Sequence, residues 1–404
     1  MTGAYFASVK LATDAVPRVD VCALSVSQIS LVNFRNYADI RLDLGASPVI
    51  LTGPNGSGKT NLLEAVSLLV PGRGLRKAQL GELQSHKESA PWAVATTLQT
   101  GNGVLRVGTG RGPESFERQR NGQAERRVLH IDGRAVKSQQ ALAEHVAMAW
   151  ITPDMDRVLA EGASARRKLL DRLAYSFDPA HAGRVQRYEK ALRERLRLLR
   201  DGVADAAWLN GLEDEMAQTG VAIAAARRQL LRQLHTAIAE TASVFPQADL
   251  ALRGMAEEAL RDEPALLVED KLRAALARTR GEDAQSGMCA VGPHRSDLLV
   301  THRLKQCPAD LCSTGEQKAL LIAIILAYVR TLARARQFLP LLLLDDIAAH
   351  LDETRRAALF DEISALGVQA WLTGTDADQF KPLGKSAQHF TVDNGVVTPL
   401  ALGK

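Results

Sequence analysis

The sequence is poor in aromatic residues and cysteines and has no long apolar run. Aromatic side chains make up 4% of its 404 residues. Its four cysteines are Cys22, Cys289, Cys307 and Cys312. Because no two of them form a Cys-x-x-Cys pair, a zinc site and a disulfide framework are disfavoured, and we expect reduced thiols in a cytoplasmic protein. The longest apolar runs, 319–329 and 340–344, are shorter than the roughly 20 residues that span a bilayer.

Residues 1–26 lack the apolar segment of a secretory signal and carry several charges. We expect them to be a disordered extension, or to precede the native start, and the folded chain to begin at Val26. The remainder has an ordinary globular composition, with 46% apolar and 24% charged residues, and its length suggests two or three domains.

The positive charge is concentrated in one stretch. Residues Arg166 to Arg200 contain 11 Lys and Arg against 4 Asp and Glu, a local net charge of +7, whereas the whole chain carries +4. Apolar residues recur there at helical spacing, and a second helix is expected from about Ala206 to Val244. We expect the two to form an antiparallel arm joined at Asp201-Gly202, whose basic face is either a solvated surface or a DNA-binding surface.

The most informative stretch runs from Gly53 to Thr60, Gly-Pro-Asn-Gly-Ser-Gly-Lys-Thr. It follows an apolar strand and precedes a helix, which is the context of a phosphate-binding P-loop. Glycines allow the loop N–H groups to converge on a phosphate at the helix N-terminus. We expect Lys59 to reach the β- and γ-phosphates and the Thr60 hydroxyl to hold Mg²⁺.

A second centre follows the apolar run Leu341–Leu344, which is typical of a buried parallel strand. Asp345 and Asp346 end this strand at the edge where α/β sheets bind ligands. We expect Asp345 to bind Mg²⁺ and Asp346 to orient or deprotonate the attacking water. The alternative is a pair of carboxylates that caps a turn.

A third motif begins the apolar helix 319–332. Ser313 and Glu316 have the spacing of a capping box, and the same helix N-terminus could offer its dipole and the Ser313 hydroxyl to a phosphate. Taken alone, the motif supports either role.

In this order, the P-loop, the Ser-x-Gly-Glu-Gln helix start, the Asp-Asp strand and Leu351-Asp352 resemble the ATP-binding-cassette superfamily. That resemblance implies that Ser313 of one subunit completes the ATP site of another. Lys59 and Ser313 lie 254 residues apart, which resembles SMC-type DNA-repair ATPases with an inserted arm and not transporter cassettes.

Within the SMC-like group the chain resembles the RecF family over roughly residues 26–404. The stretches that carry this resemblance are 33–37, 53–60, 71–76, 153–154 with 166–167 and 170–171, 292–295, 313–318 and 344–352. The resemblance implies an ATP-dependent homodimer that binds DNA at gapped or stalled-fork sites, hydrolyses ATP slowly, and works with RecO and RecR to load RecA. A transporter-energising subunit is the alternative, and an ATPase–nuclease is a third class for which we expect the 52 residues after Asp352 to be too few.

The resemblance also assigns roles to single residues. Catalysis would involve Lys59, Ser313 and Asp346, and Mg²⁺ would be held by Thr60 and Asp345. The nucleotide-binding set would comprise Arg35, Asn36, Gly53, Pro54, Asn55, Gly56, Ser57, Gly58, Lys59, Thr60, Asn61, Ser313, Gly315, Glu316 and Asp352.

Several assignments keep an alternative. Arg35 and Asn36 could contact phosphates or form a β-turn, and Arg73 and Arg76 could line the nucleotide, the DNA or a surface loop. Asp154 stands where many cassettes have a metal-contacting glutamine, and it could approach the metal or cap a helix.

Two further positions depart from the cassette pattern. No histidine occupies the switch position near Thr373 and Thr375, either of which could reach the γ-phosphate region. Asp346 stands where many cassettes have Glu. Both departures are compatible with slow turnover.

The predicted fold is therefore an α/β ATPase head, a parallel sheet plus an antiparallel β-subdomain, with an inserted helical arm. We expect the head to comprise residues 27–165 and 286–404 and the arm residues 166–285.

Overall fold

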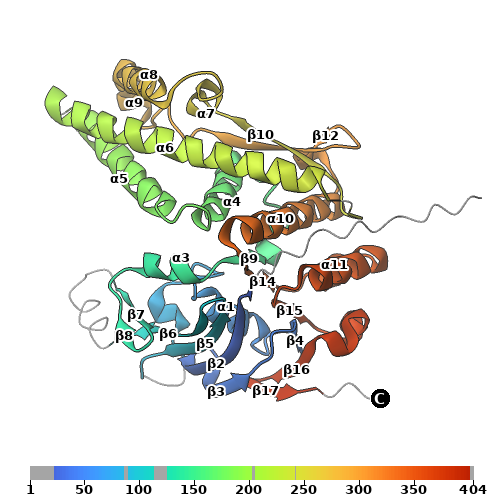
Figure 1. Ribbon diagram of the computed structural model, residues 1–404. Coiled ribbons are helices and arrows are strands. Elements are labelled where there is room, and N and C mark those ends of the chain that lie inside the picture. Colours follow the sequence, from blue (N-terminus) through green and yellow to red (C-terminus); the bar gives the residue numbers. More distant parts are fainter. Residues whose placement is uncertain (1–21, 86–89, 113–124, 203–204, 242, 401–404) are drawn as a thin grey trace, which may run out of the picture.

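The protein is described by a computed structural model that covers residues 22–85, 90–112, 125–202, 205–241 and 243–400 (Figure 1). Two six-stranded sheets form its lower part, and a largely helical region with a small sheet forms its upper part. Helix α10 (Thr314–Arg336) lies between the two parts and contacts both α6 and β9.

The first six-stranded sheet carries the P-loop. Its order is β17-β16-β4-β15-β14-β9, and every neighbouring pair is parallel except the antiparallel pair β16–β17. The strands are β4 (Val49–Thr52), β9 (Met148–Ile151), β14 (Leu341–Leu344), β15 (Ala370–Gly374), β16 (Gln388–Asp393) and β17 (Val396–Pro399). Strand β14 is buried at every position between β15 and β9, which confirms that the leucine run is a central parallel strand. Helices α1 (Lys59–Ser67) and α11 (Glu353–Leu366) follow β4 and β14.

The second six-stranded sheet is antiparallel, in the order β3-β2-β5-β6-β7-β8. Its strands are β2 (Ser25–Phe34), β3 (Tyr37–Asp43), β5 (Ala93–Thr100), β6 (Gly103–Arg111), β7 (Arg127–Ile131) and β8 (Arg134–Ala135). The expected antiparallel β-subdomain is therefore present. The sequence pattern also predicts a strand at 117–120, which lies outside the described residues. Helix α3 (Leu142–His145) leads from this sheet to β9.

The upper part contains the predicted arm. Its helices are α4 (Ala163–Tyr175), α5 (His181–Arg200), α6 (Ala206–Ala239), α7 (Met255–Ala259), α8 (Ala265–Arg278) and α9 (Arg280–Ser286). Helices α5 and α6 pack against each other and turn at Asp201-Gly202, where Gly202 has a φ of +67°. The arm has an apolar core of its own, which includes Met216, Val268 and Leu272.

Three boundaries differ from those expected. The folded chain begins before Val26, because β1 (Cys22–Ala23) pairs with β13 (Phe338–Leu339) and Leu24 is buried. Helix α6 ends at Ala239, five residues before the expected Val244. The sequence pattern also predicts a strand near 288–291, but the described chain has none there, and the next strand is β11 (Asp297–His302).

The stretch 166–285 is also not wholly helical. Strand β10 (Ala248–Arg253) pairs along its full length with β11, which adds β12 (Cys307–Pro308) on its other side. The arm therefore takes its last strands from the stretch that we assigned to the head, because a β-strand must find its hydrogen-bonding partner wherever that partner lies in the chain. No helix of the described chain combines the length and apolarity needed to cross a membrane.

Candidate nucleotide site

The loop between β4 and α1 is shaped by glycines that leave no room for a side chain. A Cβ atom at Gly53, whose φ is +148°, would lie 2.1 Å from the carbonyl oxygen of Val392. At Gly58, whose φ is +118°, it would lie 2.5 Å from Nδ2 of Asn36. Both positions combine a backbone conformation that L-residues avoid with a close neighbour. This geometry agrees with the prediction that both glycines belong to a P-loop.

Residues at the β2–β3 turn form hydrogen bonds that hold the P-loop in place. The Asn36 side-chain amide donates to the carbonyl oxygen of Ser57 at 2.9 Å and accepts from Asn61 Nδ2 at 2.7 Å. The Tyr37 hydroxyl donates to the carbonyl oxygen of Gly58 at 3.0 Å. Asn36 therefore holds the loop and its helix in place, and the sequence did not indicate the contribution of Tyr37.

Arg35 lies in the β2–β3 turn and is not among the residues that line the cavity, so its expected phosphate contact stays a prediction. Its guanidinium donates to both carboxylate oxygens of Glu64 at 2.8 Å and to the carbonyl oxygen of Glu82 at 2.7 Å. The Glu64 side chain is fully buried. A buried carboxylate requires a cation, and this requirement directs Arg35 to helix α1.

Lys59 lies on the inner side of the loop, where its ammonium group donates to the carbonyl oxygens of Gly53 at 2.7 Å and Pro54 at 2.8 Å. Burial lowers the pKa of Lys59, while Asp346 and Asp345 act in the opposite direction. Two carboxylates thus face this lysine across the cavity, as expected for the end of the Asp-Asp strand.

Asp345 is hydrogen-bonded to Thr60, the other predicted metal ligand. Its Oδ1 accepts hydrogen bonds from the hydroxyls of Thr60 at 2.9 Å and Thr373 at 2.7 Å. Burial raises the pKa of Asp345. A carboxylate and a hydroxyl this close together suit Mg²⁺, which takes hard oxygen ligands and keeps phosphate oxygens or waters in its remaining positions. The residues present therefore fit the metal.

Asp346 occupies a strained backbone position beside Asp345. Its φ is +49°, in the left-handed region that non-glycine residues avoid, and its N–H donates to the hydroxyl of Thr373 at 2.8 Å. Within the described residues, its buried Oδ1 has no hydrogen-bond partner. Such strain persists where the surroundings enforce it, and it is common at functional sites.

These groups border one cavity of about 190 Å³. Its lining residues are Asn55, Gly56, Gly58, Lys59, Thr60, Asn61, Arg76, Pro153, Asp345, Asp346 and Thr373. Arg76 donates to Asn61 Oδ1 at 2.7 Å, whereas Arg73 and Thr375 do not line the cavity. Asp154 borders an adjoining hollow and accepts from the Thr152 hydroxyl two residues earlier.

Ser313 does not line this cavity. It caps α10 in the expected capping box, with Glu316 N donating to Ser313 Oγ and Ser313 N donating to Glu316 Oε2. Lys305 pairs with Glu316 and is the main reason that the pKa of Glu316 falls to about 2. Ser313 is exposed, so the helix N-terminus faces solvent.

Other predicted nucleotide-binding residues also do not line the cavity: Asn36, Gly53, Pro54, Ser57, Gly315, Glu316 and Asp352. Asp352 caps α11, where its side chain accepts from the N–H of Arg355 at 2.8 Å. Gly315 lies in the first turn of α10, where a Cβ atom would come within 3.8 Å of Arg355. The expected roles of Asp352 and Gly315 require a second subunit and stay predictions.

An ion pair that the sequence did not indicate links the cavity to the Ser313 helix. Lys318, in the second turn of α10, lies 3.1 Å from Asp156 Oδ2, and its side chain is 4% exposed. Asp156 directly follows the turn Pro153–Met155, whose first residue lines the cavity. No sequence spacing indicates this contact, because 162 residues separate its partners.

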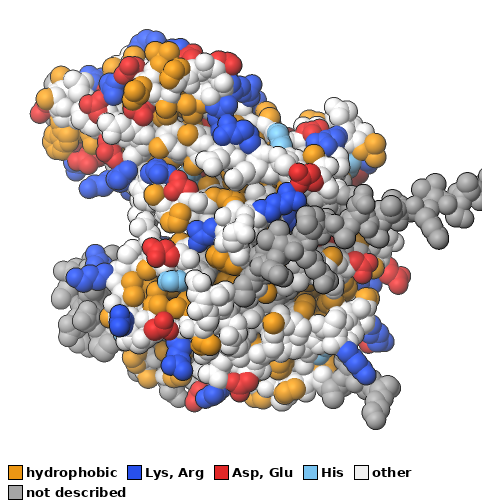
Figure 2. Space-filling view, viewed as in Figure 1, with side chains coloured by type: hydrophobic (Ala, Val, Ile, Leu, Met, Phe, Trp, Pro, Cys, Tyr) orange, Lys and Arg blue, Asp and Glu red, His pale blue; other side chains and the backbone are white. Residues whose placement is uncertain are grey.

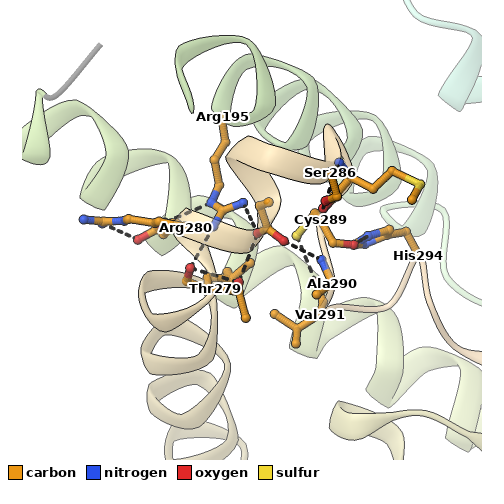
Figure 3. A network of polar contacts seen from close by, with 12 residues as sticks. Arg195, Thr279, Arg280, Ser286, Cys289, Ala290, Val291 and His294 are labelled. Atoms are coloured by element: carbon orange, nitrogen blue, oxygen red, sulfur yellow. Dashed lines mark hydrogen bonds and ion pairs between the residues drawn. The ribbon is translucent and has the colours of Figure 1, made fainter. Parts of the chain in front are cut away.

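The stretch Gly292 to Arg295 has a structural role in the arm. The Tyr188 hydroxyl lies 2.6 Å from Nδ1 of His294. The Nε2 atom of His294 lies 3.0 Å from the carbonyl oxygen of Cys289 (Figure 3). Close by, the buried Arg195 donates to Glu213 and Asp283. These bonds tie α5 and α6 to the segment that follows α9.

A second buried arginine joins the same segment to α4. Arg227 of α6 binds both carboxylate oxygens of Asp171 and the carbonyl oxygen of Pro293 at 2.8 Å. Arg166 binds both carboxylate oxygens of Asp297 at 2.8 Å. The motif residues Arg166 and Asp171 therefore join the base of the arm to strand β11.

Comparison with known proteins gives a consistent result at the level of sequence. The family model described as "RecF/RecN/SMC N terminal domain" matches residues 25–398. The DNA replication and repair protein RecF of Mesorhizobium japonicum is 46% identical over 376 residues, which cover 93% of this chain and 97% of that protein. RecF of Agrobacterium fabrum is 45% identical over 378 residues, covering 93% and 98%.

Solved structures show the same fold. A structure of the recombination mediator protein RecF with ATPrS superposes with a TM-score of 0.81 at 22% identity, covering 94% of this chain and 99% of the other. A second structure, of RecF with ATP, gives a TM-score of 0.78 with the same coverage.

Proposed function

The chain belongs to the RecF family of DNA replication and repair proteins, and from this premise we propose that it is an ATP-switched DNA-binding dimer. ATP would join two copies, the dimer would hold DNA at gapped or single-strand–double-strand regions, and slow hydrolysis would release it. The family further suggests cooperation with RecO and RecR in loading RecA.

The observation that carries this proposal is an incomplete cavity. The P-loop, Thr60, Asp345 and Asp346 meet at one site, and the capped N-terminus of α10 lies outside it with Ser313 exposed. A helix N-terminus attracts anions through its free N–H groups and its dipole. A second copy that brings its Ser313 to this cavity would complete the enclosure of a triphosphate.

Within the cavity, each group has a distinct task. The loop N–H groups and Lys59 would hold the β- and γ-phosphates, and Arg76 would add positive charge at the entrance. Thr60 and Asp345 would hold Mg²⁺, which neutralises charge on the phosphate oxygens when it is bound. Asp346 would orient the attacking water and take its proton, because its unpartnered Oδ1 is free to accept.

We expect Ser313→Arg to bind ATP as a monomer and to lose ATP-dependent dimerisation. An arginine at the helix start would project bulk and charge into the contact, while the P-loop of the same copy stays intact. Sedimentation velocity with ATP, ADP and no nucleotide, each with and without gapped duplex DNA, measures the outcome.

Lys59→Met is the matched control, because it should lose nucleotide binding itself. Thr314→Arg is a second control, because Thr314 is also exposed. It adds the same charge one residue further along α10 and tests whether the loss of dimerisation is specific to position 313. If the Ser313→Arg protein dimerises with ATP at the same protein concentration as the wild-type protein, the proposed enclosure is contradicted.

A further inference from the structure

The exposed face of α5 carries a row of five basic side chains, with the carboxylates of Glu189 and Glu194 on the same face. Its exposed basic residues are Arg187, Lys190, Arg193, Arg197 and Arg200. At 3.6 residues per turn they fall within an arc of about 140° and span about 20 Å along the helix. The opposite face of α5 is buried against α6 at Tyr188, Ala191, Arg195 and Leu198.

Two of these cations are left without a carboxylate partner. Arg187, Arg193 and Arg200 lie within 4 Å of Glu215, Glu189 and Asp201, respectively. Lys190 and Arg197 form no ion pair within the described chain. Cations that the protein does not neutralise are available to phosphates, which release counterions when they bind.

The row borders a hollow between the arm and the antiparallel sheet (Figure 2). Lys and Arg side chains follow the edge of the upper part that overhangs this hollow. The hollow ends at the first turn of α5, because α5 there contacts the residues that follow the antiparallel sheet. A Cβ atom at Gly183 would lie 3.6 Å from Nε2 of Gln140. Arg134 and Lys137, both exposed, precede Gln140 on the sheet side.

The tip of the arm, where α5 turns into α6, carries an exposed tryptophan. Trp208 is 45% exposed in the first turn of α6, just after the turn that follows Arg200. The other three tryptophans, Trp92, Trp150 and Trp371, are at most 9% exposed. An exposed aromatic ring at the same end of the arm as Arg200 offers a stacking surface for a base at the end of a duplex.

We infer that the basic face of α5 binds the phosphate backbone of duplex DNA, with Trp208 lying against the DNA at the tip of the arm. This inference rests on the proposed DNA-binding function and specifies where the DNA lies. A row of cations with one aromatic residue favours a duplex that ends at a single-stranded region over a continuous single strand, which would need several stacking rings.

The test measures DNA affinity across a salt series with ATP present, using a gapped duplex and a fully paired duplex. For Lys190→Ala/Arg197→Ala we expect the slope of log K against log salt to fall in magnitude by about 1.8, at about 0.9 for each lost phosphate contact. Lys190→Arg/Arg197→Lys should keep the wild-type slope. The matched control Lys381→Ala/Lys385→Ala removes the same charge from exposed positions of the head and should also keep it.

Tryptophan emission gives a second readout, because Trp208 is the exposed fluorophore. We expect saturating gapped duplex to change the emission of the wild-type protein and to leave Trp208→Phe unchanged. An unaltered salt slope in Lys190→Ala/Arg197→Ala, or unaltered wild-type emission at saturation, would overturn the inference while DNA binding persists. Failure of the wild-type protein to bind either DNA with ATP would instead remove the proposed function.

Discussion

At the scale of single residues, the site depends on which charges are neutralised and which are free. Arg35 and Glu64 neutralise each other behind α1 at 2.8 Å, and the Glu64 side chain is fully buried. Asp346 differs, because its backbone is strained and its buried Oδ1 lacks a partner among the described residues. One oxygen of the Asp346 carboxylate, which lies near Lys59 at the cavity, is thus left without a hydrogen-bond donor.

This contrast predicts the behaviour of Asp346→Asn. The amide keeps the size of the side chain but cannot take a proton, so we expect hydrolysis to fall by about 10²- to 10⁴-fold, the usual contribution of a general base. ATP binding and ATP-dependent dimerisation should persist, with a longer residence time on DNA. Single-turnover hydrolysis and dissociation from labelled gapped duplex measure both effects.

Asp43→Asn is the matched control, because that side chain is 73% exposed on β3 and outside the cavity. It should hydrolyse ATP at the wild-type rate. An Asp346→Asn protein with wild-type turnover would show that another group activates the water.

At the scale of elements, the arm depends on a segment without regular structure. Residues 287–296 run between α9 and β11, and they are held by Tyr188, Arg227 and the carbonyl oxygen of Cys289. Gly292 allows this approach, because its φ is +127° and a Cβ there would lie 2.1 Å from the Tyr188 hydroxyl.

We therefore expect Gly292→Ala to lower the free energy of unfolding by about 2–4 kcal/mol, through both backbone strain and the displacement of Tyr188. Gly287→Ala is the matched control: its φ is +68° and its Cβ would meet open space, so it should cost only about 1 kcal/mol. Chemical denaturation followed by circular dichroism measures both. Equal losses in the two variants would show that the contact with Tyr188 is unimportant.

At the scale of the whole molecule, one partly buried ion pair connects the cavity with the surface expected to meet a second copy. Lys318 belongs to the helix that Ser313 caps, and Asp156 follows the turn that borders the cavity. A shift of that turn on nucleotide binding would reach α10 through this pair, because the Lys318 ammonium group is too buried to exchange Asp156 for water.

We expect Asp156→Asn to weaken ATP-dependent dimerisation more than ATP binding by the monomer. Removal of the carboxylate leaves the buried Lys318 ammonium group unpaired, and because Asp156 is 27% exposed we expect a cost of about 1–3 kcal/mol in stability. The double variant Asp156→Asn/Lys318→Met should regain much of this loss, since it removes both charges. A double-mutant cycle, measured by denaturation and by sedimentation with ATP, gives the coupling free energy between Asp156 and Lys318. Strictly additive effects of the two substitutions would exclude such a coupling.

The sequence by itself determined the local parts of this protein. The glycines at 53 and 58, the capping box at Ser313 and the apolar strand before Asp345 follow from short-range rules of backbone conformation, hydrogen bonding and burial. These rules located the P-loop, the Asp-Asp strand and the α5–α6 hairpin, and they predicted a parallel sheet and an antiparallel β-subdomain without the order of their strands. Membership of the RecF family was recognised from the same motifs and is shown by the comparisons.

Only the tertiary structure decided which distant groups meet. The pairing of Arg35 with Glu64, of Asp156 with Lys318 and of β10 with β11 depends on how separate segments dock. The nearest charges in the sequence do not identify these partners. Burial selects them, because a carboxylate, an ammonium group or a strand edge removed from water must find a complement wherever the fold places one.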